Sequence, residues 1–413
     1  MTKIEKNISP TKVVTHTNCR LCNAANMESV ISLGSQYIND FPEKKNIGNG
    51  VKAPLEIVHC DNCDLAQLKH TAPQELLYSR QYWYRSGVTQ TMRRELNDIV
   101  NELQNYINLS KDDIVLDIGA NDGTMLNYFS DDLIKIGCEP ANNLVDELSN
   151  NCDRVIHDFW SEDAYLNSVK DLNNKKAKVV TAIGMFYDLD DPVAFVSDIE
   201  KVLDDDGIFV AQLMTLAPML EKNDLGNICH EHIEFYSFKS IKYLFEKNGL
   251  EIFKISSNDI NGGSYRFYCR KFKRGSIRLP KENILKMMKK FVYRVKMNKR
   301  ITVNFIKKQI ENNKKIFLYG ASTKGNTVLQ YYGLNKEMIP YAAERSPFKW
   351  GKYTIGTGIK IISEKQAKKM KPDFFFVTPW GFIKEFIKRE KNWLNNGGKF
   401  ILPFPNMKII GRK

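Results

Sequence analysis

The sequence has no long apolar run and very little histidine. None of its apolar stretches approaches the roughly 18 residues that a membrane-spanning helix requires, and residues 1–12 lack the apolar core of a secretory signal. These absences argue against a membrane-spanning or secreted protein and predict a soluble, cytoplasmic one. With 413 residues, 43% of them apolar, the chain is long enough for two or three domains that each bury a core.

The charge is unbalanced, with a net value of +13. An excess of this size suits an anionic partner, and nucleic acid, an acidic membrane and nucleotide-linked metabolites all qualify. Part of the excess lies in a helical-looking stretch from Lys286 to Lys315. This stretch fits a solvated helix face better than a binding surface, so charge alone does not identify the partner.

Eight cysteines are present, and four of them form two close pairs, Cys19-Arg-Leu-Cys22 and Cys60-Asp-Asn-Cys63. Two residues between paired thiolates let each pair chelate from a tight turn, and four sulfur ligands satisfy tetrahedral zinc with no open position. We therefore predict a structural Zn²⁺ site. The stretch between the pairs is longer than in a zinc ribbon, but a long insertion costs little loop entropy. At least three of the other four cysteines are interpreted as buried free thiols.

The chain divides into a cysteine module and two regions in which apolar strands alternate with amphipathic helices. We predict a module over residues 1–72, a doubly wound parallel α/β domain over 73–272 and a second α/β domain over 273–413. Residues 73–107 are expected to be helical, with an interruption at 81–88. The expected strands are 54–59, 114–118, 133–139, 179–185, 207–214, a hairpin of 251–257 and 264–270, and then 316–319, 339–343, 373–378 and 399–402. No internal repeat is apparent.

Two of the six histidines lie in the cluster Cys229-His-Glu-His-Ile-Glu234. The unperturbed pKa of imidazole is close to neutrality, so histidine is the usual side chain for removing a proton at physiological pH. The cluster is therefore the predicted centre of proton transfer. A surface loop with two solvated imidazoles is the alternative interpretation.

A glycine-rich turn follows the first expected strand of the doubly wound domain. Gly119 lets the chain turn tightly at the carboxyl edge of the sheet, Gly123 permits close approach of a ligand, and Asp117 and Asp122 supply acceptors. Glu139 follows at the end of the next strand, where a carboxylate can accept from both ribose hydroxyls. Because acidic side chains suit a cationic ligand without phosphate, the pattern favours S-adenosylmethionine over a dinucleotide.

Asp158 and Phe159 follow the third strand region of the same domain. They are predicted to hold adenine by a hydrogen bond and by stacking. A helix cap is an equally good interpretation of Asp158 alone.

Six motifs occur in the order seen in the sugar C-methyltransferases, and the chain resembles this family from about residue 19 to residue 405. The motifs are the Cys-x-x-Cys pairs, Asp117-Ile-Gly-Ala-Asn-Asp-Gly123, Met185-Phe-Tyr-Asp-Leu-Asp-Asp-Pro192, Ile228-Cys-His-Glu-His232, Asn258-Asp-Ile-Asn-Gly-Gly-Ser-Tyr-Arg266 and Tyr319-Gly-Ala-Ser-Thr-Lys-Gly-Asn326. The family consists of S-adenosylmethionine enzymes that methylate a nucleotide-linked 4-keto deoxysugar at carbon 3. The resemblance implies a zinc module, a Rossmann-like methyltransferase domain and a Rossmann-like C-terminal domain that binds the nucleotide sugar.

The resemblance also implies roles for individual residues. His232 matches the second histidine of the family's His-Glu-His motif, to which the base role belongs, while His230 and Glu231 orient it or steady the substrate, with Tyr84 as a further catalytic candidate. The implied cofactor-binding residues are Tyr82, Asp117, Gly119, Asn121, Asp122, Gly123, Glu139, Asp158, Phe159 and Met185. The implied substrate-binding residues are Asn261, Ser264, Arg266, Gly320, Ser322, Lys324, Asn326, Glu344 and Arg345.

The chain departs from some relatives directly before the His-Glu-His motif. Those relatives carry tyrosine where this chain has Cys229, so a hydroxyl contact to the sugar or a proton-donating phenol is missing there. Tyr82, Tyr84 and Tyr187 are the candidates to replace it.

The turn from Gly320 to Asn326 is typical of a phosphate site. It leads from a strand into a helix and presents backbone donors and a helix amino terminus, with Lys324 adding charge. Glu344 and Arg345 follow the next strand and are predicted to grip the base or the pyrophosphate. A purely structural turn is the alternative. The basic surplus then becomes a field that attracts a dianionic sugar nucleotide.

Two other functions share part of this pattern. A zinc-containing RNA methyltransferase would also combine metal, cofactor domain and positive charge, but no RRM or KH sequence is visible and the phosphate turn does not suit a polymer. A catalytically silent nucleotide-sugar-binding protein would need an idle His232 beside an intact glycine-rich turn. We therefore expect an enzyme without a nucleic-acid or membrane partner, acting as a monomer, and leave the nucleotide carrier open among dTDP, GDP and CDP.

Overall fold

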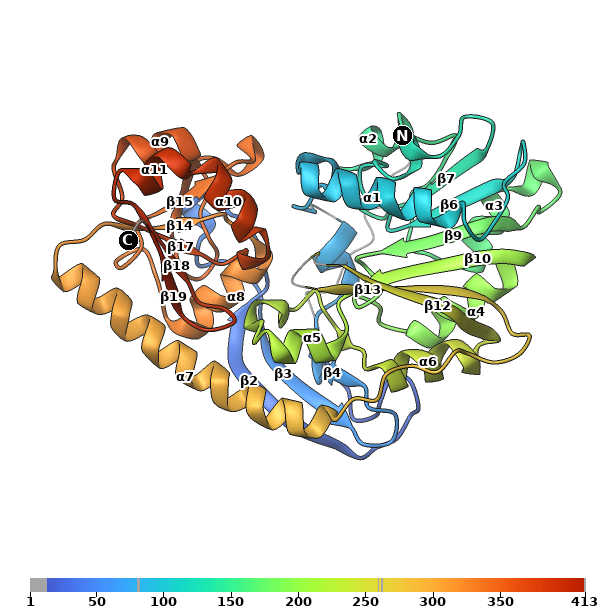
Figure 1. Cartoon of the computed structure of the whole chain (residues 1–413), viewed down its shortest axis with the longest axis horizontal. Coiled ribbons are helices and arrows are strands. Elements are labelled where there is room, and N and C mark those ends of the chain that lie inside the picture. The colour runs from blue at the N-terminus through green and yellow to red at the C-terminus, as the bar shows by residue number, and fades with distance from the viewer. Residues whose placement is uncertain (1–12, 80–81, 259, 261–262, 412–413) are drawn as a thin grey trace.

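The computed structural model describes residues 13–79, 82–258, 260 and 263–411. Figure 1 shows two α/β lobes, with three strands of the N-terminal module, β2 (Met27–Tyr37), β3 (Lys52–Cys60) and β4 (Ala66–Leu68), between and below them. A 28-residue helix, α7 (Ile284–Glu311), runs along the lower edge of the C-terminal lobe. In the part of the chain described, no helix combines the length and the apolar character needed to cross a bilayer.

The first lobe is built on a seven-stranded sheet with the order β12-β13-β10-β9-β6-β7-β8. Its parallel strands are β6 (Ile114–Ile118), β7 (Ile134–Cys138), β8 (Arg154–Ile156), β9 (Ala177–Ile183) and β10 (Leu203–Leu213). The antiparallel hairpin of β12 (Leu250–Asn258) and β13 (Ser264–Lys271) continues the sheet beyond β10. The predicted doubly wound sheet with its closing hairpin is confirmed.

Polar caps fix where several helices of this lobe begin. The side chains of Thr89, Ser161, Asp191 and Ser237 each accept a backbone N–H of the first turn. The helices are α1 (Gln90–Leu103), α2 (Val145–Ser149), α3 (Glu162–Ser168), α4 (Pro192–Val202), α5 (Leu216–Glu221) and α6 (Phe238–Lys247). Single helical turns occur at Glu75–Ser79, Ser86–Val88, Leu126–Tyr128, Lys170–Leu172 and Leu225–Asn227. The long helix expected from residue 73 thus takes regular form only after Thr89.

The C-terminal lobe contains a six-stranded sheet with the order β16-β15-β14-β17-β18-β19, in which only β19 runs antiparallel. The strands are β14 (Ile316–Tyr319), β15 (Tyr341–Glu344), β16 (Lys360–Ser363), β17 (Phe374–Val377), β18 (Lys399–Leu402) and β19 (Lys408–Ile410). The helices are α8 (Thr323–Tyr332), α9 (Glu364–Lys369), α10 (Ile383–Arg389) and α11 (Lys391–Asn395), with short turns at Pro347–Lys349 and Trp380–Phe382.

The two lobes share one strand order. In each, the first strand lies in the middle of the sheet, the next two lie on one side of it, and the fourth and fifth lie on the other. Successive strands are therefore added first on one side of β6 and β14 and then on the other, and open α/β sheets bind ligands in the crevice where this order reverses. The fold contains a repeat of architecture, although no sequence repeat was apparent.

The N-terminal module shares its cores with both lobes. β11 (Glu234–Phe235) of the first lobe pairs with β4 and extends the module's sheet to β11-β4-β3-β2, while β1 (Val14–Thr15) pairs with β5 (His70–Thr71). The cysteines and their apolar neighbours pack into the core of the first lobe. Apolar residues of β2 and β3 pack with α7 and the C-terminal sheet. The proposed domain boundaries at residues 72 and 272 stay a prediction.

Candidate active site

A cavity of ≈ 630 Å³ lies between the two lobes. All three parts of the chain line it, and its walls include Asn39, Tyr84, Glu231, His232, Lys324 and Lys349. Several residues predicted from separate motifs therefore face one space. Gly184, directly after β9, and Ser322, after β14, also line it, so the cavity touches the carboxyl ends of strands in both sheets.

The four paired cysteines meet away from the cavity, against the core of the first lobe. Their sulfur atoms all lie within 4.8 Å of one another, with 3.5 Å between the sulfurs of Cys19 and Cys63 and 3.5 Å between those of Cys22 and Cys60. The two pairs sit on matching turns, because the backbone N–H of Asn23 donates to Cys19 and that of Asp64 donates to Cys60. Four thiolates at this spacing fit a closed tetrahedral Zn²⁺ site.

The glycine-rich turn after β6 is held by the acid of the next strand. Gly119 has a φ of +71°, and a side chain there would come within 2.7 Å of Met185, so only glycine fits. The carboxylate of Glu139 accepts from the backbone N–H of Asn121 at 2.9 Å and from that of Ala141 at 2.9 Å. Burial raises the pKa of Glu139. The turn and the acid therefore lie together, and the contact of Glu139 with the cofactor ribose stays a prediction.

Asp117 lies at the end of β6, below this turn. Its carboxylate accepts from the hydroxyl of Thr181 at 2.7 Å. Burial raises the pKa of Asp117 to about 7, so the group titrates near neutrality.

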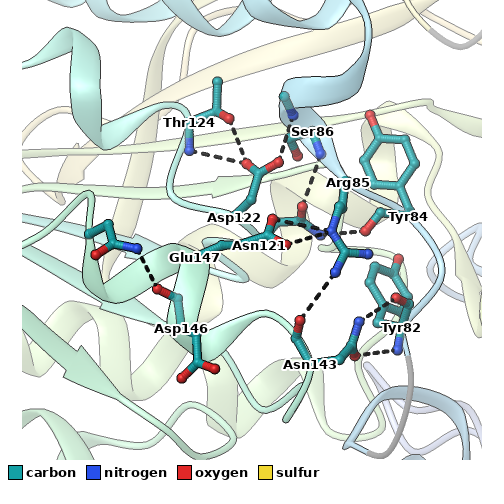
Figure 2. Close-up of polar contacts among 12 residues, drawn as sticks. Tyr82, Tyr84, Arg85, Ser86, Asn121, Asp122, Thr124, Asn143, Asp146 and Glu147 are labelled. Atoms are coloured by element: carbon teal, nitrogen blue, oxygen red, sulfur yellow. Dashed lines mark hydrogen bonds and ion pairs between the residues drawn. The ribbon is translucent and has the colours of Figure 1, made fainter. Parts of the chain in front are cut away.

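A segment from Tyr82 to Val88 lies over the same turn (Figure 2). The side chain of Asn121 accepts from the backbone N–H of Ser86 at 2.9 Å, and that of Asp122 accepts from Gly87 at 2.7 Å. Tyr82 exchanges two backbone hydrogen bonds with the amide of Asn143, a residue that sequence reasoning missed because it belongs to no motif. Asn121 and Asp122 thus position this segment, which carries Tyr82 and Tyr84 to the cavity.

The predicted adenine residues come after the outermost strand of the first sheet. Asp158 and Phe159 follow β8, and the carboxylate of Asp158 accepts from the N–H of Phe159 at 2.7 Å. The carbonyl of Asp158 also accepts from the thiol of Cys138. Gly123, on the other side of the turn, has a φ of +75°, and a side chain there would meet Asn151.

His232 has the geometry of a neutral base. Its Nδ1 lies 2.8 Å from the carbonyl oxygen of Asn227, which can only accept, so Nδ1 carries the proton and Nε2 keeps its lone pair. Burial, assisted by the positive charge of Lys324, lowers the pKa of His232 to about 3. The ring of Tyr187 packs against the imidazole, with 4.4 Å between ring centroids. The imidazole is therefore uncharged at pH 7.

The two other members of the motif point to different partners. Nε2 of His230 donates to the carbonyl of Ala53 in β3 at 3.1 Å, and burial lowers the pKa of His230 to about 4. Burial raises the pKa of Glu231 to about 7, opposed in part by a hydrogen bond from Asn39. The hydroxyl of Tyr78 donates to the carbonyl of Glu231. His230 thus connects the motif to the N-terminal module, while Glu231 lines the cavity.

The turn after β14 repeats the arrangement seen after β6. Gly320 has a φ of +83°, and the carboxylate of Glu344 at the end of β15 accepts from the backbone N–H of Ala321 at 2.8 Å and from those of Arg345 and Ser346. Ser322 caps α8 by accepting from the N–H of Gly325. Glu344 therefore occupies in the second crevice the place that Glu139 occupies in the first.

The remaining substrate candidates divide between the cavity and the protein interior. Ser264 lines the cavity, and Asn326 donates to the side-chain oxygen of Asn39 at 2.6 Å. The guanidinium of Arg266 is buried against Glu95 and Glu102, at 2.7 Å from each, and has its charge balanced there. Arg345 is half exposed, 3.7 Å from Glu385, and Asn261 lies outside the described residues.

Three protein-family models match successive parts of the chain. Residues 19–78 match a zinc binding domain, residues 88–255 a methyltransferase domain and residues 259–405 a C-methyltransferase C-terminal domain. The chain is 26% identical over 407 residues to the C-methyltransferase NovU of Streptomyces niveus, which covers 95% of this chain and 96% of NovU.

Two solved structures resemble part of the fold. An S-adenosylmethionine-dependent methyltransferase from Clostridium acetobutylicum is 12% identical with a TM-score of 0.35, covering 44% of this chain and 92% of that chain. The magnesium protoporphyrin IX methyltransferase of Synechocystis with bound S-adenosylhomocysteine is 12% identical with a TM-score of 0.35, covering 46% of this chain and 90% of that one.

The family matches and the site agree on the cofactors. The zinc binding match contains the four clustered cysteines, and the methyltransferase match contains the glycine-rich turn and Glu139. The protein uses S-adenosylmethionine and a structural zinc ion. Three family models match successive parts of the chain, and NovU aligns with nearly its whole length. The chain therefore belongs to the zinc-containing, S-adenosylmethionine-dependent C-methyltransferases, the family that its motifs resemble.

Proposed function

We propose that the protein methylates carbon 3 of a nucleotide-diphosphate-linked 4-keto deoxysugar, in the synthesis of a branched-chain sugar. The observation that carries the proposal is the neutral imidazole of His232 on the wall of a cavity between two similar crevices. One crevice suits the methyl donor, and the other combines a helix amino terminus with Lys324, as a diphosphate requires. A base between the two crevices can reach a sugar that extends from the second.

The reaction follows from the acidity of the carbon beside a carbonyl. Nε2 of His232 takes the proton from carbon 3, and the electron pair of the broken C–H bond forms the enolate of the 4-keto group. S-adenosylmethionine, when bound, supplies a methyl group on a cationic sulfur, so that the new C–C bond forms as the S–CH₃ bond breaks. Holding both reactants in line contributes roughly 7–11 kcal/mol to lowering the barrier.

Other tyrosines can supply the phenol that Cys229 lacks. Tyr82, Tyr84 and Tyr187 all line the cavity, and Tyr187 packs on the base itself. Their position in the cavity supports the proposal that one of them donates a hydrogen bond to a polar group of the sugar. The nucleotide carrier stays open among dTDP, GDP and CDP. A monomeric state, a cytoplasmic location and the absence of nucleic-acid and membrane partners stay predictions.

Substitutions of Glu139 and of Glu344 are expected to weaken the binding of different ligands. Glu139→Gln is expected to weaken binding of S-adenosylhomocysteine about tenfold and to leave nucleoside diphosphate binding unchanged, because an amide keeps one acceptor oxygen and turns its NH₂ group toward a backbone N–H that now donates to Glu139. Glu344→Gln is expected to do the reverse. Isothermal titration of both variants with both ligands measures this double dissociation. Loss of the same ligand in both variants would contradict the assignment of the crevices.

The proposed reaction is tested with S-adenosylmethionine and a panel of dTDP-, GDP- and CDP-linked 4-keto-6-deoxysugars in deuterium oxide. Mass spectrometry follows methyl transfer and hydrogen exchange beside the carbonyl in the same samples. We expect methylation of at least one sugar, with exchange at carbon 3. Absence of exchange with every sugar would reject the proposal.

A further inference from the structure

A buried lysine lies where the second crevice meets the cavity. Lys349 is 9% exposed, lines the cavity, and donates from Nζ to the carbonyl of Ala321 at 2.8 Å. Its Nζ also lies 4.5 Å from the ring centroid of Phe41. The negative charge of Glu344 attracts the Lys349 ammonium, but the oxygens of that carboxylate already accept three backbone N–H groups. One carbonyl and one ring leave N–H donors of this ammonium free for an anion.

A buried hydroxyl lies close to the amino terminus of α8, which follows Ala321 and Ser322. Thr378, directly after β17, is 4% exposed and lines the cavity, and its Oγ1 has no hydrogen-bond partner among the described residues. A Cβ on Gly325 would lie 2.5 Å from this oxygen, which places it against the first turn of α8. Burying a hydroxyl without a partner is unfavourable, so a ligand atom at this position would satisfy it.

The backbone adds donors at the same place. The first turn of a helix leaves its leading N–H groups without intrahelical partners, and the amino terminus carries partial positive charge. In α8 the N-cap serine satisfies Gly325, so the N–H groups of Thr323 and Lys324 are not used by the helix. Ammonium, hydroxyl and backbone donors therefore all lie at the start of α8, with Lys349 at Ala321 and Thr378 at Gly325.

We propose that Lys349, Thr378 and the first turn of α8 form a binding site for one phosphoryl group. The site for a phosphoryl group stands on the contacts above. That the phosphoryl group belongs to a nucleotide diphosphate rests on the proposed function. Neither Lys349 nor Thr378 belongs to a motif. They deepen the proposal by assigning to the second crevice two further substrate-positioning residues, contributed by the chain after β15 and after β17.

Titration calorimetry with inorganic pyrophosphate tests the site directly. Lys349→Met is expected to weaken pyrophosphate binding at least about tenfold, and Thr378→Val about threefold, because each removes a donor from an anion. Binding of S-adenosylhomocysteine should stay within twofold in both variants and reports on folding. Lys352→Met, three residues away at a half-buried lysine paired with Glu43, is the matched control and should bind pyrophosphate like the parent.

The outcomes separate this site from the proposed reaction. If pyrophosphate does not bind the parent, or binds Lys349→Met and Thr378→Val as tightly as the parent, the phosphoryl site is wrong. If pyrophosphate binding depends on both residues and competes with nucleoside diphosphates, the site stands even when no sugar is methylated. In steady-state assays we expect Lys349→Met to raise KM for the sugar nucleotide at least about tenfold with kcat within threefold. An unchanged KM would also overturn the site.

Discussion

His232→Asn is expected to lower kcat for methyl transfer about 10³-fold or more while both ligands bind as they do to the parent. A positioned general base contributes roughly 10²–10⁴-fold, and asparagine offers no basic nitrogen in place of Nε2. Its amide N–H can still donate to the carbonyl of Asn227, which now receives Nδ1–H at 2.8 Å. The substitution therefore removes the lone pair and preserves the local hydrogen bond.

Two readouts identify the lost step. Deuterium incorporation at carbon 3 should fall together with methyl transfer, because both require removal of the same proton. Calorimetry with S-adenosylhomocysteine and with the nucleoside diphosphate should give dissociation constants within about twofold of the parent. Turnover within tenfold of the parent would show that another group is the base.

His230→Asn is the matched control for this experiment. The imidazole of His230 donates to the carbonyl of Ala53 in the N-terminal module. Its loss should therefore lower the free energy of unfolding, and kcat should fall far less than in His232→Asn. A loss of deuterium exchange in His230→Asn equal to that in His232→Asn would transfer the base role or divide it between the two residues.

Cys60→Ser is expected to cause the largest loss of stability of any single substitution discussed above. Structural zinc contributes roughly 10–16 kcal/mol of binding free energy in small metal-dependent domains, and a serine hydroxyl is a poor substitute for thiolate. Cys60 is fully buried in a core that joins the module to the first lobe. Loss of the ion therefore disturbs the packing of both.

The measurements are zinc content by native mass spectrometry and thermal unfolding. We expect less than one zinc ion per chain and a Tm lower by at least about 10 °C. Cys152→Ser, at a half-buried cysteine of the first lobe outside the metal cluster, is the control and should keep its zinc. A Cys60→Ser protein that is folded, free of metal and fully active would disprove the structural role of zinc.

The predictable parts of the fold are those with uninterrupted apolar strands. The strands Ile114–Ile118, Ile316–Tyr319 and Lys399–Leu402 match their predicted bounds. β2 was missed, because Gly34 interrupts its pattern; with a φ of +78° it lies within a register shift against β3. The short strand β16 was missed as well.

The site was predictable where chemistry depends on a local motif. The paired cysteines, the turn at Gly119 with Glu139, and His232 all lie where the motifs indicated. Contacts over long separations could not be read from the chain. Arg266 and its two glutamates are far apart in sequence, and Lys349 and Thr378 belong to no motif that marks them as ligand residues, although Glu344 and Arg345 precede Lys349 closely.

The position of the N-terminal module limits how relatives of this protein can exchange parts. The backbone of Tyr37 exchanges two hydrogen bonds with the side chain of Gln330 in α8, Asn39 donates to Thr323, and β4 pairs with β11 of the first lobe. Replacing only the C-terminal lobe, in order to change the nucleotide carrier, would leave a mismatched seam along residues 37–43. A chimaera that keeps both crevices in register must inherit that segment together with its new lobe, so the unit of recombination is discontinuous in the gene.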